Sequence, residues 1–465
     1  MAKTYPNLMK PLKVTDKLTL KNRLSVAPTG SFFLMYGEKG DYTFNMMDYL
    51  CERARGGFGL ITLGAIPSDM TVDYKNPIDD QIAPLYAPKH FKNAAANMLD
   101  RVHAYGTKVF IQLSTGHGRM RTEKVPSPLP YLNDRNMILP ELTREEIEQK
   151  IDEEIKTAKF VKECGFDGVE VHAMHWGYLL DQFAQPFTNH RTDEYGGDLD
   201  GRLLVCKKIV EGIKRECGAD FPVSIRMGLK WWMEDFNKPS LFGEKEVGRT
   251  VEDAVEIAKK LESYGYDMLN CNSGTYDSFY WLYPPTYQKE GLWLEDAKKI
   301  KEAVNIPVIC PGKILVPEMA EKAIEEGYTD AVALGKACLA DAEWANKAKR
   351  GDDEDIRPCI RCNEGCLERT FYCYKAVSCA LNPQISREGE LEITPAAVKK
   401  NIAVVGGGPA GLEAARVLSL RGHSVTVFEK GELGGQLNEA SVPEFKADIR
   451  GLKDYLITAV NKQGV

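Results

Sequence analysis

One local signal recurs between residues 20 and 340 and constrains the fold more than any other feature of the chain. A helical stretch ends in glycine and runs directly into a short apolar segment, in the stretches ARGGFGLI, AYGTKVFI, ECGFDGVEV, SYGYDMLN and EEGYTDAVAL. Glycine readily ends a helix, and a run of β-branched and apolar residues favours a strand. The alternation therefore predicts repeated βα units around a parallel sheet.

Eight strand candidates occur in this part of the chain. They span residues 23–30, 58–65, 108–115, 168–175, 222–228, 266–274, 307–313 and 331–337. Eight βα units close naturally into a (β/α)8 TIM barrel, which we predict for residues 1–350, and an open doubly wound sheet is the alternative. A barrel of this kind carries its chemistry at the C-terminal ends of its strands.

The residues at those strand ends are unusually small or polar, which makes them candidates for ligand contacts. They are Ala27, Pro28, Thr29, Gly64, Gln112, His172, His175, Arg226, Gly312, Lys313, Gly335 and Lys336. The last four follow the seventh and eighth strands, where accessible backbone N–H groups and a nearby cation commonly hold a phosphate. The sequence therefore predicts a phosphate-bearing ligand at the barrel mouth.

His172, His175 and Tyr178 form a second group of candidates at and after the fourth strand. Imidazoles can donate hydrogen bonds to a substrate carbonyl or carboxylate. A phenol with an ordinary pKa of about 10 is protonated at neutral pH and can deliver a proton. We interpret the three as catalytic. A bound metal is one alternative, for which the sequence offers no third ligand nearby, and purely local hydrogen bonding is another.

Five of the twelve cysteines lie between residues 359 and 379. The spacing Cys359-x2-Cys362-x3-Cys366-x12-Cys379 supplies four thiolates, and such sets hold iron–sulfur clusters or structural zinc. Three close cysteines followed by a distant one differ from the paired knuckles of zinc ribbons. The prediction is therefore a 4Fe-4S cluster, with zinc as the alternative. Cys373 lies inside the same span and is a potential substitute ligand.

A new strand begins at Asn401 and opens the stretch VVGGGPAG, which is followed by a helix and by a second strand that ends in an acid. The glycines permit a tight turn and close approach of a pyrophosphate to the helix N-terminus, and the acid can bind a ribose. The candidate nucleotide contacts are Gly406, Gly408, Gly411, Glu429, Gly435 and Gln436. We assign residues 351–397 to the cluster segment and linker, and residues 398–465 to the start of a Rossmann-like domain.

Composition excludes several classes of partner. The formal net charge of −7 and the pI of 5.7 give the chain no general attraction for nucleic acid or anionic membranes. No window approaches the roughly 18 uninterrupted apolar residues of a membrane span. The N-terminus lacks the charged and apolar stretches of an export signal. We therefore expect a cytoplasmic protein that binds neither nucleic acid nor membrane.

Several stretches together carry a resemblance to a known family. They include LKNRLSVAP, IQLSTGHGR, FDGVEVHAMHWGYLLDQF, NHRTDEYGG, CIRCNEGCLERT and VVGGGPAGLEAA. The chain resembles the Old Yellow Enzyme superfamily, in its branch with trimethylamine dehydrogenase and 2,4-dienoyl-CoA reductase, and within that branch it is most similar to the anaerobic 2-enoate reductases. The resemblance implies FMN in the barrel, a 4Fe-4S cluster on the cysteines and FAD on the Rossmann-like part, with NADH as electron donor.

The resemblance also implies a role for each candidate residue. Flavin contacts would come from Ala27, Pro28, Thr29, Gly64, Gln112 and Arg226, and phosphate contacts from Gly312, Lys313, Gly335 and Lys336. The family usually has arginine where Lys336 stands, so the two-pronged phosphate contact would be lost. His172 and His175 would orient the substrate carbonyl or carboxylate. Tyr178 would protonate Cα after hydride reaches Cβ.

The activity implied is reduction of the activated C=C bond of an α,β-unsaturated carboxylate, a 2-enoate such as a cinnamate-like aryl acrylate. The loop after the sixth strand would cover the substrate or pack within itself, through Tyr276, Phe279, Tyr280, Trp281, Tyr283 and Tyr287. Dienoyl-CoA reduction, amine dehydrogenation and non-enzymatic electron transfer are the competing readings. The expected partner is the small acid, and a homo-oligomer is left open.

The FAD-binding part is short. About 65 residues follow Asn401, whereas a full FAD-binding domain with its inserted NADH-binding domain needs on the order of 250. We therefore expect a fragment or truncated form with an incomplete FAD site. Such a chain would keep FMN and the cluster, bind FAD poorly and respond little to NADH.

Overall fold

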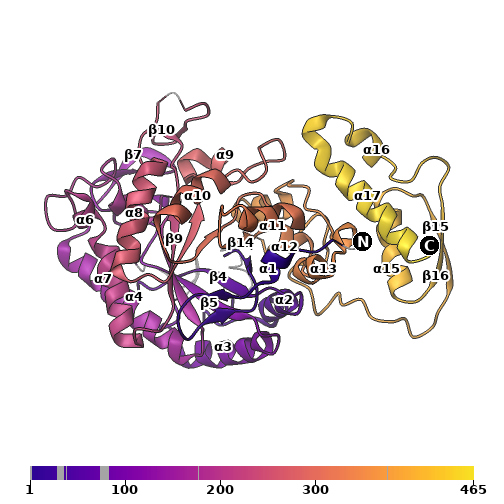
Figure 1. The fold of residues 1–465 in the computed structure, drawn as a ribbon, viewed down its shortest axis with the longest axis horizontal. Helices are drawn as coiled ribbons and strands as arrows, with labels where there is room; N and C mark the ends of the chain where they lie inside the picture. Colours follow the sequence, from indigo (N-terminus) through magenta and orange to yellow (C-terminus); the bar gives the residue numbers. More distant parts are fainter. Residues whose placement is uncertain are drawn as a thin grey trace.

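Eight parallel strands close into a barrel in the computed structural model, which describes every residue except 1–2, 29–35, 38, 74–82, 176, 244 and 374. The strands are β3 (Leu24–Val26), β4 (Leu60–Pro67), β5 (Lys108–Ser114), β8 (Gly168–Met174), β9 (Val223–Gly228), β12 (Met268–Asn272), β13 (Val308–Cys310) and β14 (Ala331–Leu334). Each of these strands pairs with the next along the chain, and β14 pairs with β3 to close the ring. Figure 1 shows the barrel, with β4, β5, β9 and β14 labelled. The predicted TIM barrel is confirmed, and the open doubly wound sheet is wrong.

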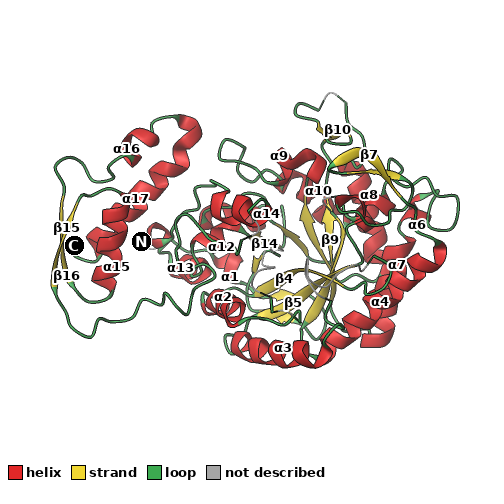
Figure 2. Ribbon diagram, turned by 180° about the vertical axis from the view of Figure 1, so that it is seen from behind, coloured by secondary structure: helices red, strands yellow, loops and turns green. Residues whose placement is uncertain are grey.

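Helices cover the outside of the barrel (Figure 2). They are α2 (Phe44–Arg55), α3 (Pro88–His103), α4 (Arg144–Glu163), α7 (Leu204–Cys217), α8 (Val251–Tyr264), α10 (Leu294–Ala303), α11 (Pro317–Glu325) and α13 (Trp344–Arg350). Shorter helices are α1 (Pro6–Met9), α5 (Leu179–Ala184), α6 (Leu199–Arg202), α9 (Phe279–Leu282) and α12 (Lys336–Ala340). Local rules set the ends of the long helices. Thr250 begins α8 with a capping box, and Gly265 of the repeat SYGYDMLN ends it in the left-handed conformation.

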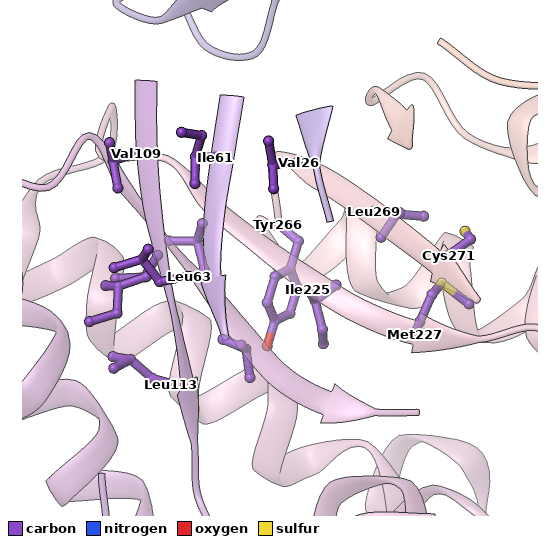
Figure 3. Close-up of a cluster of buried hydrophobic side chains, with 14 of the residues drawn as sticks. Val26, Ile61, Leu63, Val109, Leu113, Ile225, Met227, Tyr266, Leu269 and Cys271 are labelled. Carbon is purple, nitrogen blue, oxygen red and sulfur yellow. The ribbon is translucent and has the colours of Figure 1, made fainter. Parts of the chain in front are cut away.

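Two sets of side chains hold the barrel together, because successive side chains of a strand point to opposite faces. One set, which includes Val26, Ile61 and Ile225, packs with side chains of the covering helices in a single hydrophobic cluster (Figure 3). The other set faces the barrel axis and begins with an apolar layer of Leu60, Phe110, Met268, Ile309, Ala331 and Ala333. The hairpin β1 (Leu12–Lys13) and β2 (Thr19–Leu20) packs on this layer and closes the N-terminal end of the barrel. Ligands therefore have access at the opposite end.

Two further antiparallel hairpins decorate the barrel. They are formed by β6 (Leu129–Tyr131) with β7 (Asp134–Leu139), and by β10 (Met233–Asp235) with β11 (Lys238–Pro239). None of the helices among the described residues combines the length and the apolar character that a membrane-crossing helix needs.

The cysteine-rich segment is mostly irregular. Its regular parts are a π-helical turn over Glu364–Glu368 and the single turn of α14 (Arg369–Phe371). Gly365 is required in this turn, because a Cβ there would lie 2.7 Å from the carbonyl oxygen of Ser378. The linker that follows is tied to the barrel where Arg53 of α2 pairs with Glu388 at 3.0 Å, with both side chains buried.

The C-terminal residues form a small α/β unit. Strands β15 (Asn401–Val405) and β16 (Ser424–Phe428) pair in parallel, and α15 (Pro409–Leu420) and α17 (Ala447–Lys462) pack against them, with α16 (Leu437–Ala440) between. The predicted start of a Rossmann-like domain is confirmed. Its core also takes in Ile360 and Leu381 of the cysteine-rich segment, so the two parts pack together (Figure 1).

Candidate active site

A cavity of about 250 Å³ opens at the C-terminal ends of the barrel strands. Most strand-end residues predicted from the sequence line it. They are Ala27, Pro28, Gln112, His172, His175, Tyr178, Arg226, Gly312, Lys313, Gly335 and Lys336. The barrel brings them together because the ends of its eight strands meet at one rim.

Two predicted flavin contacts stand apart from this set. Thr29 lies outside the described residues. Gly64 is buried within β4, and the cavity wall at this strand is formed by its neighbour Ala65. The pairing of β4 with β5 shifts register between Leu63 and Ile66, which changes the alternation of side chains at this point of the strand.

A buried carboxylate that sequence reasoning missed organises the floor of the cavity. Glu170, on β8, accepts hydrogen bonds from Gln112 Nε2 at 2.7 Å and from Asn270 Nδ2 at 2.9 Å. Arg226 donates in turn to Asn270 Oδ1. Burial raises the pKa of Glu170, and the Arg226 charge opposes this rise. A charged residue inside the apolar run VEV was the available signal.

The Arg226 side chain retains an unused donor. Its Nε is buried and finds no hydrogen-bond partner within the described part of the chain. A buried N–H without a partner is costly, so a ligand acceptor at this position is expected. The edge of a flavin ring, which carries carbonyl oxygens and gains negative charge on reduction, fits this donor.

His172, His175 and Tyr178 stand together at one wall of the cavity. The ring centroid of His172 lies 4.3 Å from that of His175 and 4.4 Å from that of Tyr178. Burial, with added repulsion from Arg226, depresses the pKa of both histidines well below 6.5. Both imidazoles are therefore neutral near pH 7, each with one N–H to donate. His172 Nδ1 is buried and has no partner among the described residues, so it is available to a ligand.

Tyr178 is held by a second phenol. Its Oη lies 3.2 Å from Tyr276 Oη, and its ring packs edge-on against His117 with the centroids 4.9 Å apart. Burial raises the pKa of Tyr178 well above its ordinary value, and Tyr276 raises it further. The phenol therefore keeps its proton at neutral pH. His117, which sequence reasoning missed, also lines the cavity, and its Nδ1 lies 3.1 Å from Glu123 Oε1.

The aromatic loop after β12 was expected either to cover the substrate or to pack within itself, and different residues of the loop do each. Tyr276 and Tyr283 line the cavity. Trp281 stacks on Trp232 with the ring centroids 4.1 Å apart, and Tyr287 is 63% exposed. Part of the loop therefore faces the ligand space, and the rest packs on the β10–β11 side or faces solvent.

The predicted phosphate contacts lie at the ends of β13 and β14. Gly312 and Lys313 both have positive φ, 139° and 60°, so the chain turns sharply here. The Lys313 ammonium donates to the carbonyl oxygens of Pro285 and Thr286 at 2.9 and 2.8 Å, which directs it to the loop after β12. Burial lowers the pKa of Lys313 to about 8.

A smaller cavity of about 20 Å³ adjoins the first. All four predicted cluster ligands line it, namely Cys359, Cys362, Cys366 and Cys379. Lys336 lines both cavities, and its Nζ donates to Asn363 Oδ1 at 3.0 Å. Cys373 is exposed and does not line this cavity.

The cysteine sulfurs receive hydrogen bonds from the backbone. The N–H of Arg361 donates to Cys359 Sγ at 3.4 Å, and the N–H of Leu381 donates to Cys379 Sγ at 3.5 Å. Across the described ranges, no three histidine, cysteine, aspartate or glutamate side chains meet closely enough to hold a single metal ion. The cysteines thus surround a space rather than converge on a point.

The nucleotide fingerprint has the predicted turn. Gly406 has φ 101°, and a Cβ on Gly411 would lie 1.9 Å from the Gly406 carbonyl oxygen. A Cβ on Gly435 would lie 2.9 Å from Gly408 Cα, so these two glycines allow the loops to touch.

The acid and the amide predicted beside the turn lie close to it. Glu429 accepts hydrogen bonds from the N–H groups of Gly407 at 2.7 Å and Gly431 at 2.8 Å, which lower its pKa. Gln436 precedes α16. The carboxylate of Glu429 therefore steadies the glycine turn, and its remaining lone pairs can accept from a ribose.

Comparisons with known proteins agree with this organisation. The family model described as NADH:flavin oxidoreductase / NADH oxidase family matches residues 7–355, and the one described as NAD(P)-binding Rossmann-like domain matches residues 404–452. The chain is 42% identical to cinnamate reductase of Clostridium sporogenes over 475 residues, covering 100% of this chain and 71% of the relative. It is 37% identical to NADH oxidase of Thermoanaerobacter brockii, covering 99% and 69%.

Among solved structures, 2-naphthoyl-CoA reductase in complex with 2-naphthoyl-CoA is similar, with a TM-score of 0.88 and 28% identity. The match covers 99% of this chain and 70% of that chain. The likeness therefore extends over the barrel, the cysteine-rich segment and the Rossmann-like unit together.

Proposed function

We propose, from the premise that this chain belongs to the NADH:flavin oxidoreductase / NADH oxidase family, that its barrel cavity reduces the C=C bond of an α,β-unsaturated carboxylate. The chain is a flavin-dependent oxidoreductase; the finer statement about the substrate is the proposal. The observation that carries it is the group of two neutral imidazoles and one protonated phenol on the cavity wall, at His172, His175 and Tyr178. The 42% identity to a cinnamate reductase supports the same substrate class.

The residues around the two cavities fit the expected cofactors. Arg226, with its unused buried Nε, and Gln112 suit the edge of FMN, and the strand ends at Gly312 and Gly335 suit its phosphate. Bound FMN would supply hydride, a 4Fe-4S cluster would carry single electrons, and FAD and NADH would supply them. We propose FMN and FAD as the two flavins, with the Rossmann-like unit as the site for FAD.

The cysteine set suits a 4Fe-4S cluster better than zinc. The four cysteines line one cavity, and their spacing of three close residues and one distant residue differs from the paired knuckles of zinc ribbons. The backbone donors to the Cys359 and Cys379 sulfurs are of the kind that stabilises the charge of an iron–sulfur cluster.

The chain's own residues would bind the substrate and move one proton. The neutral N–H groups of His172 and His175 donate to the substrate carboxylate or carbonyl oxygen and draw electron density away from Cβ. The Tyr178 O–H then protonates Cα. Uncharged donors suit this task, because they polarise the alkene without adding a proton to the carboxylate.

The proposal is tested with protein loaded with FMN and iron under anaerobic conditions. After reduction with dithionite, the flavin absorbance should return on mixing with cinnamate, and the oxidised flavin should not bleach with trimethylamine. Reoxidation by a 2,4-dienoyl-CoA in place of cinnamate would indicate the competing reductase activity. Bleaching by the amine would replace the proposal with amine dehydrogenation.

A further inference from the structure

The proposed acid is the first of three linked phenols. Tyr178 Oη lies 3.2 Å from Tyr276 Oη, and the Tyr283 phenol stands on the same cavity wall, where its charge would act on Tyr276. Tyr178 comes from the end of β8, whereas the other two come from the loop after β12. All three line the larger cavity. The fold thus joins two strand ends through a row of hydroxyl groups.

Proton delivery by a phenol leaves a phenolate behind, and a phenolate is costly in an apolar wall. A catalytic cycle therefore needs a group that stabilises the Tyr178 oxygen and returns a proton to it. Tyr276 Oη lies within hydrogen-bond distance of Tyr178 Oη. Tyr283 lines the same cavity and supplies a third phenol beside Tyr276.

We propose that Tyr276 and Tyr283 are positioning residues that return a proton to Tyr178 in each turnover. This inference rests on the proposed alkene reduction. When the Tyr178 O–H bond breaks and its proton forms the new Cα–H bond, the Tyr276 proton passes to the Tyr178 oxygen. The Tyr283 proton passes to the Tyr276 oxygen, and a solvent proton restores Tyr283. One solvent proton is consumed for each alkene reduced.

Charged groups of both signs face the row. Arg121 lowers the pKa values of Tyr178 and Tyr276, and Arg226 lowers that of Tyr283. Glu123 opposes this at Tyr178, and Cys366 opposes it at Tyr283.

The hydrogen bond to Tyr276 raises the pKa of Tyr178, which favours the return of a proton to the Tyr178 oxygen. The imidazole rings of His117, His172 and His175 also pack against the Tyr178 ring.

The test uses protein that is loaded with FMN and iron and then reduced. Its flavin reoxidation by cinnamate is followed by stopped flow at a series of D2O fractions. Tyr276→Phe removes the hydroxyl and keeps the ring. We expect it to slow flavin reoxidation by roughly tenfold, a small part of what a general acid typically contributes. We also expect a plot of the reoxidation rate constant against the D2O fraction to be curved for the wild type and linear for the variant. Tyr283→Phe should give the same change in smaller measure.

Two further measurements keep the outcome interpretable. The Kd for cinnamate, from its perturbation of the oxidised flavin spectrum, should be unchanged by Tyr276→Phe. Tyr280→Phe, on the same loop but outside the cavity wall, is the matched control and should behave as wild type. A wild-type rate and an unchanged D2O curve in Tyr276→Phe would overturn the relay. Failure of wild-type protein to reoxidise with cinnamate would instead overturn the proposed function.

Discussion

At the scale of single residues, Tyr178 and its two histidine neighbours differ in the chemistry that they can perform. Burial acts on them in opposite directions: it removes the charge from the imidazoles and keeps the proton on the phenol. The same desolvated wall therefore makes His172 and His175 neutral donors and makes Tyr178 an acid. Substrate recognition and protonation are separated between them.

Replacing Tyr178 by phenylalanine should remove the proton donor without changing the shape of the wall. We expect alkene reduction to slow by about 100-fold or more, within the usual range for a general acid, while reduction of the flavin by dithionite keeps its rate. Rapid-mixing measurements of the two half-reactions check this. Equal rates for wild type and Tyr178→Phe in the alkene half-reaction would remove Tyr178 from the acid's role.

Functional residues can be predicted from the sequence where a polar side chain stands at a strand end. They are harder to predict where the side chain acts only through its packing partners. His172, Arg226 and Lys336 stand at strand ends, where a polar residue is conspicuous, and all three line the cavity. Glu170 lies inside an apolar strand, so its part in holding Gln112 became visible only through the closed barrel.

At the scale of elements, α4 carries a buried carboxyl against the barrel. Burial raises the pKa of Glu154 to about 7, and the hydrogen bond that its carboxylate accepts from Ser68 Oγ opposes this rise. Its folded pKa lies above the unfolded value of about 4.5, so the folded state holds a proton that the unfolded state releases. Stability from this group is thus present below pH 4.5 and is lost as the pH rises through 7.

Glu154→Gln should abolish that loss, because the amide is neutral at every pH and still accepts from Ser68. Relative to wild type, we expect the variant to gain stability between pH 5 and pH 8, by up to about 3 kcal/mol. Urea unfolding at several pH values measures the gain. Glu145→Gln, exposed on the same helix, should show no such gain. A constant difference between Glu154→Gln and wild type across this range would contradict the assignment.

The glycine turn of the Rossmann-like unit is a second element-scale test. Gly411→Ala would place a Cβ 1.9 Å from the Gly406 carbonyl oxygen, so the turn must open. We expect a higher Kd for FAD than that of the wild type, measured by titration of the apoprotein, with FMN binding by the barrel unchanged. Gly451→Ala is the matched control, because its Cβ meets nothing within 4 Å inside α17. It should stabilise by roughly 0.5–1 kcal/mol and leave the Kd for each flavin as in the wild type.

Elements were more predictable than their irregularities. Glycine-ended helices such as the one at Gly265 mark several of the βα units in the sequence, because the helix stop and the strand start are both local. The register shift in β4 between Leu63 and Ile66, which puts Ala65 at the wall, depends on its pairing with β5. Such a shift is a property of two strands together, and one strand's residues do not encode it.

At the scale of the whole molecule, one arginine of the cysteine-rich segment connects that segment to the barrel and to the Rossmann-like unit. Arg361 lies between two of the cysteines predicted to hold the cluster, lines the larger cavity, and makes ion pairs with Asp448 of α17 and with Glu290 of the barrel. Its side chain is 3% exposed. The Rossmann-like unit is therefore fixed to the barrel through the segment that would hold the cluster.

Asp448→Ala should loosen this attachment, because it leaves the buried Arg361 charge without its main partner. Breaking such a pair typically costs about 3–5 kcal/mol. We expect faster tryptic cleavage in the linker that ends at Lys399 and Lys400, with an intact barrel fragment. Glu354→Gln, which affects an exposed pair with Lys462, should cleave at the wild-type rate. Linker cleavage at an unchanged rate in Asp448→Ala would show that the attachment does not depend on this pair.

Alkene reduction in the barrel cavity is tested by the product formed in a single anaerobic turnover. Protein loaded with FMN and iron is reduced, freed of excess reductant and mixed with cinnamate, and the acids are then quantified. We expect cinnamate to be converted to 3-phenylpropanoate in proportion to the reducing equivalents stored, and Tyr178→Phe to form far less in the same time. Recovery of unchanged cinnamate from fully reduced wild-type protein would contradict it.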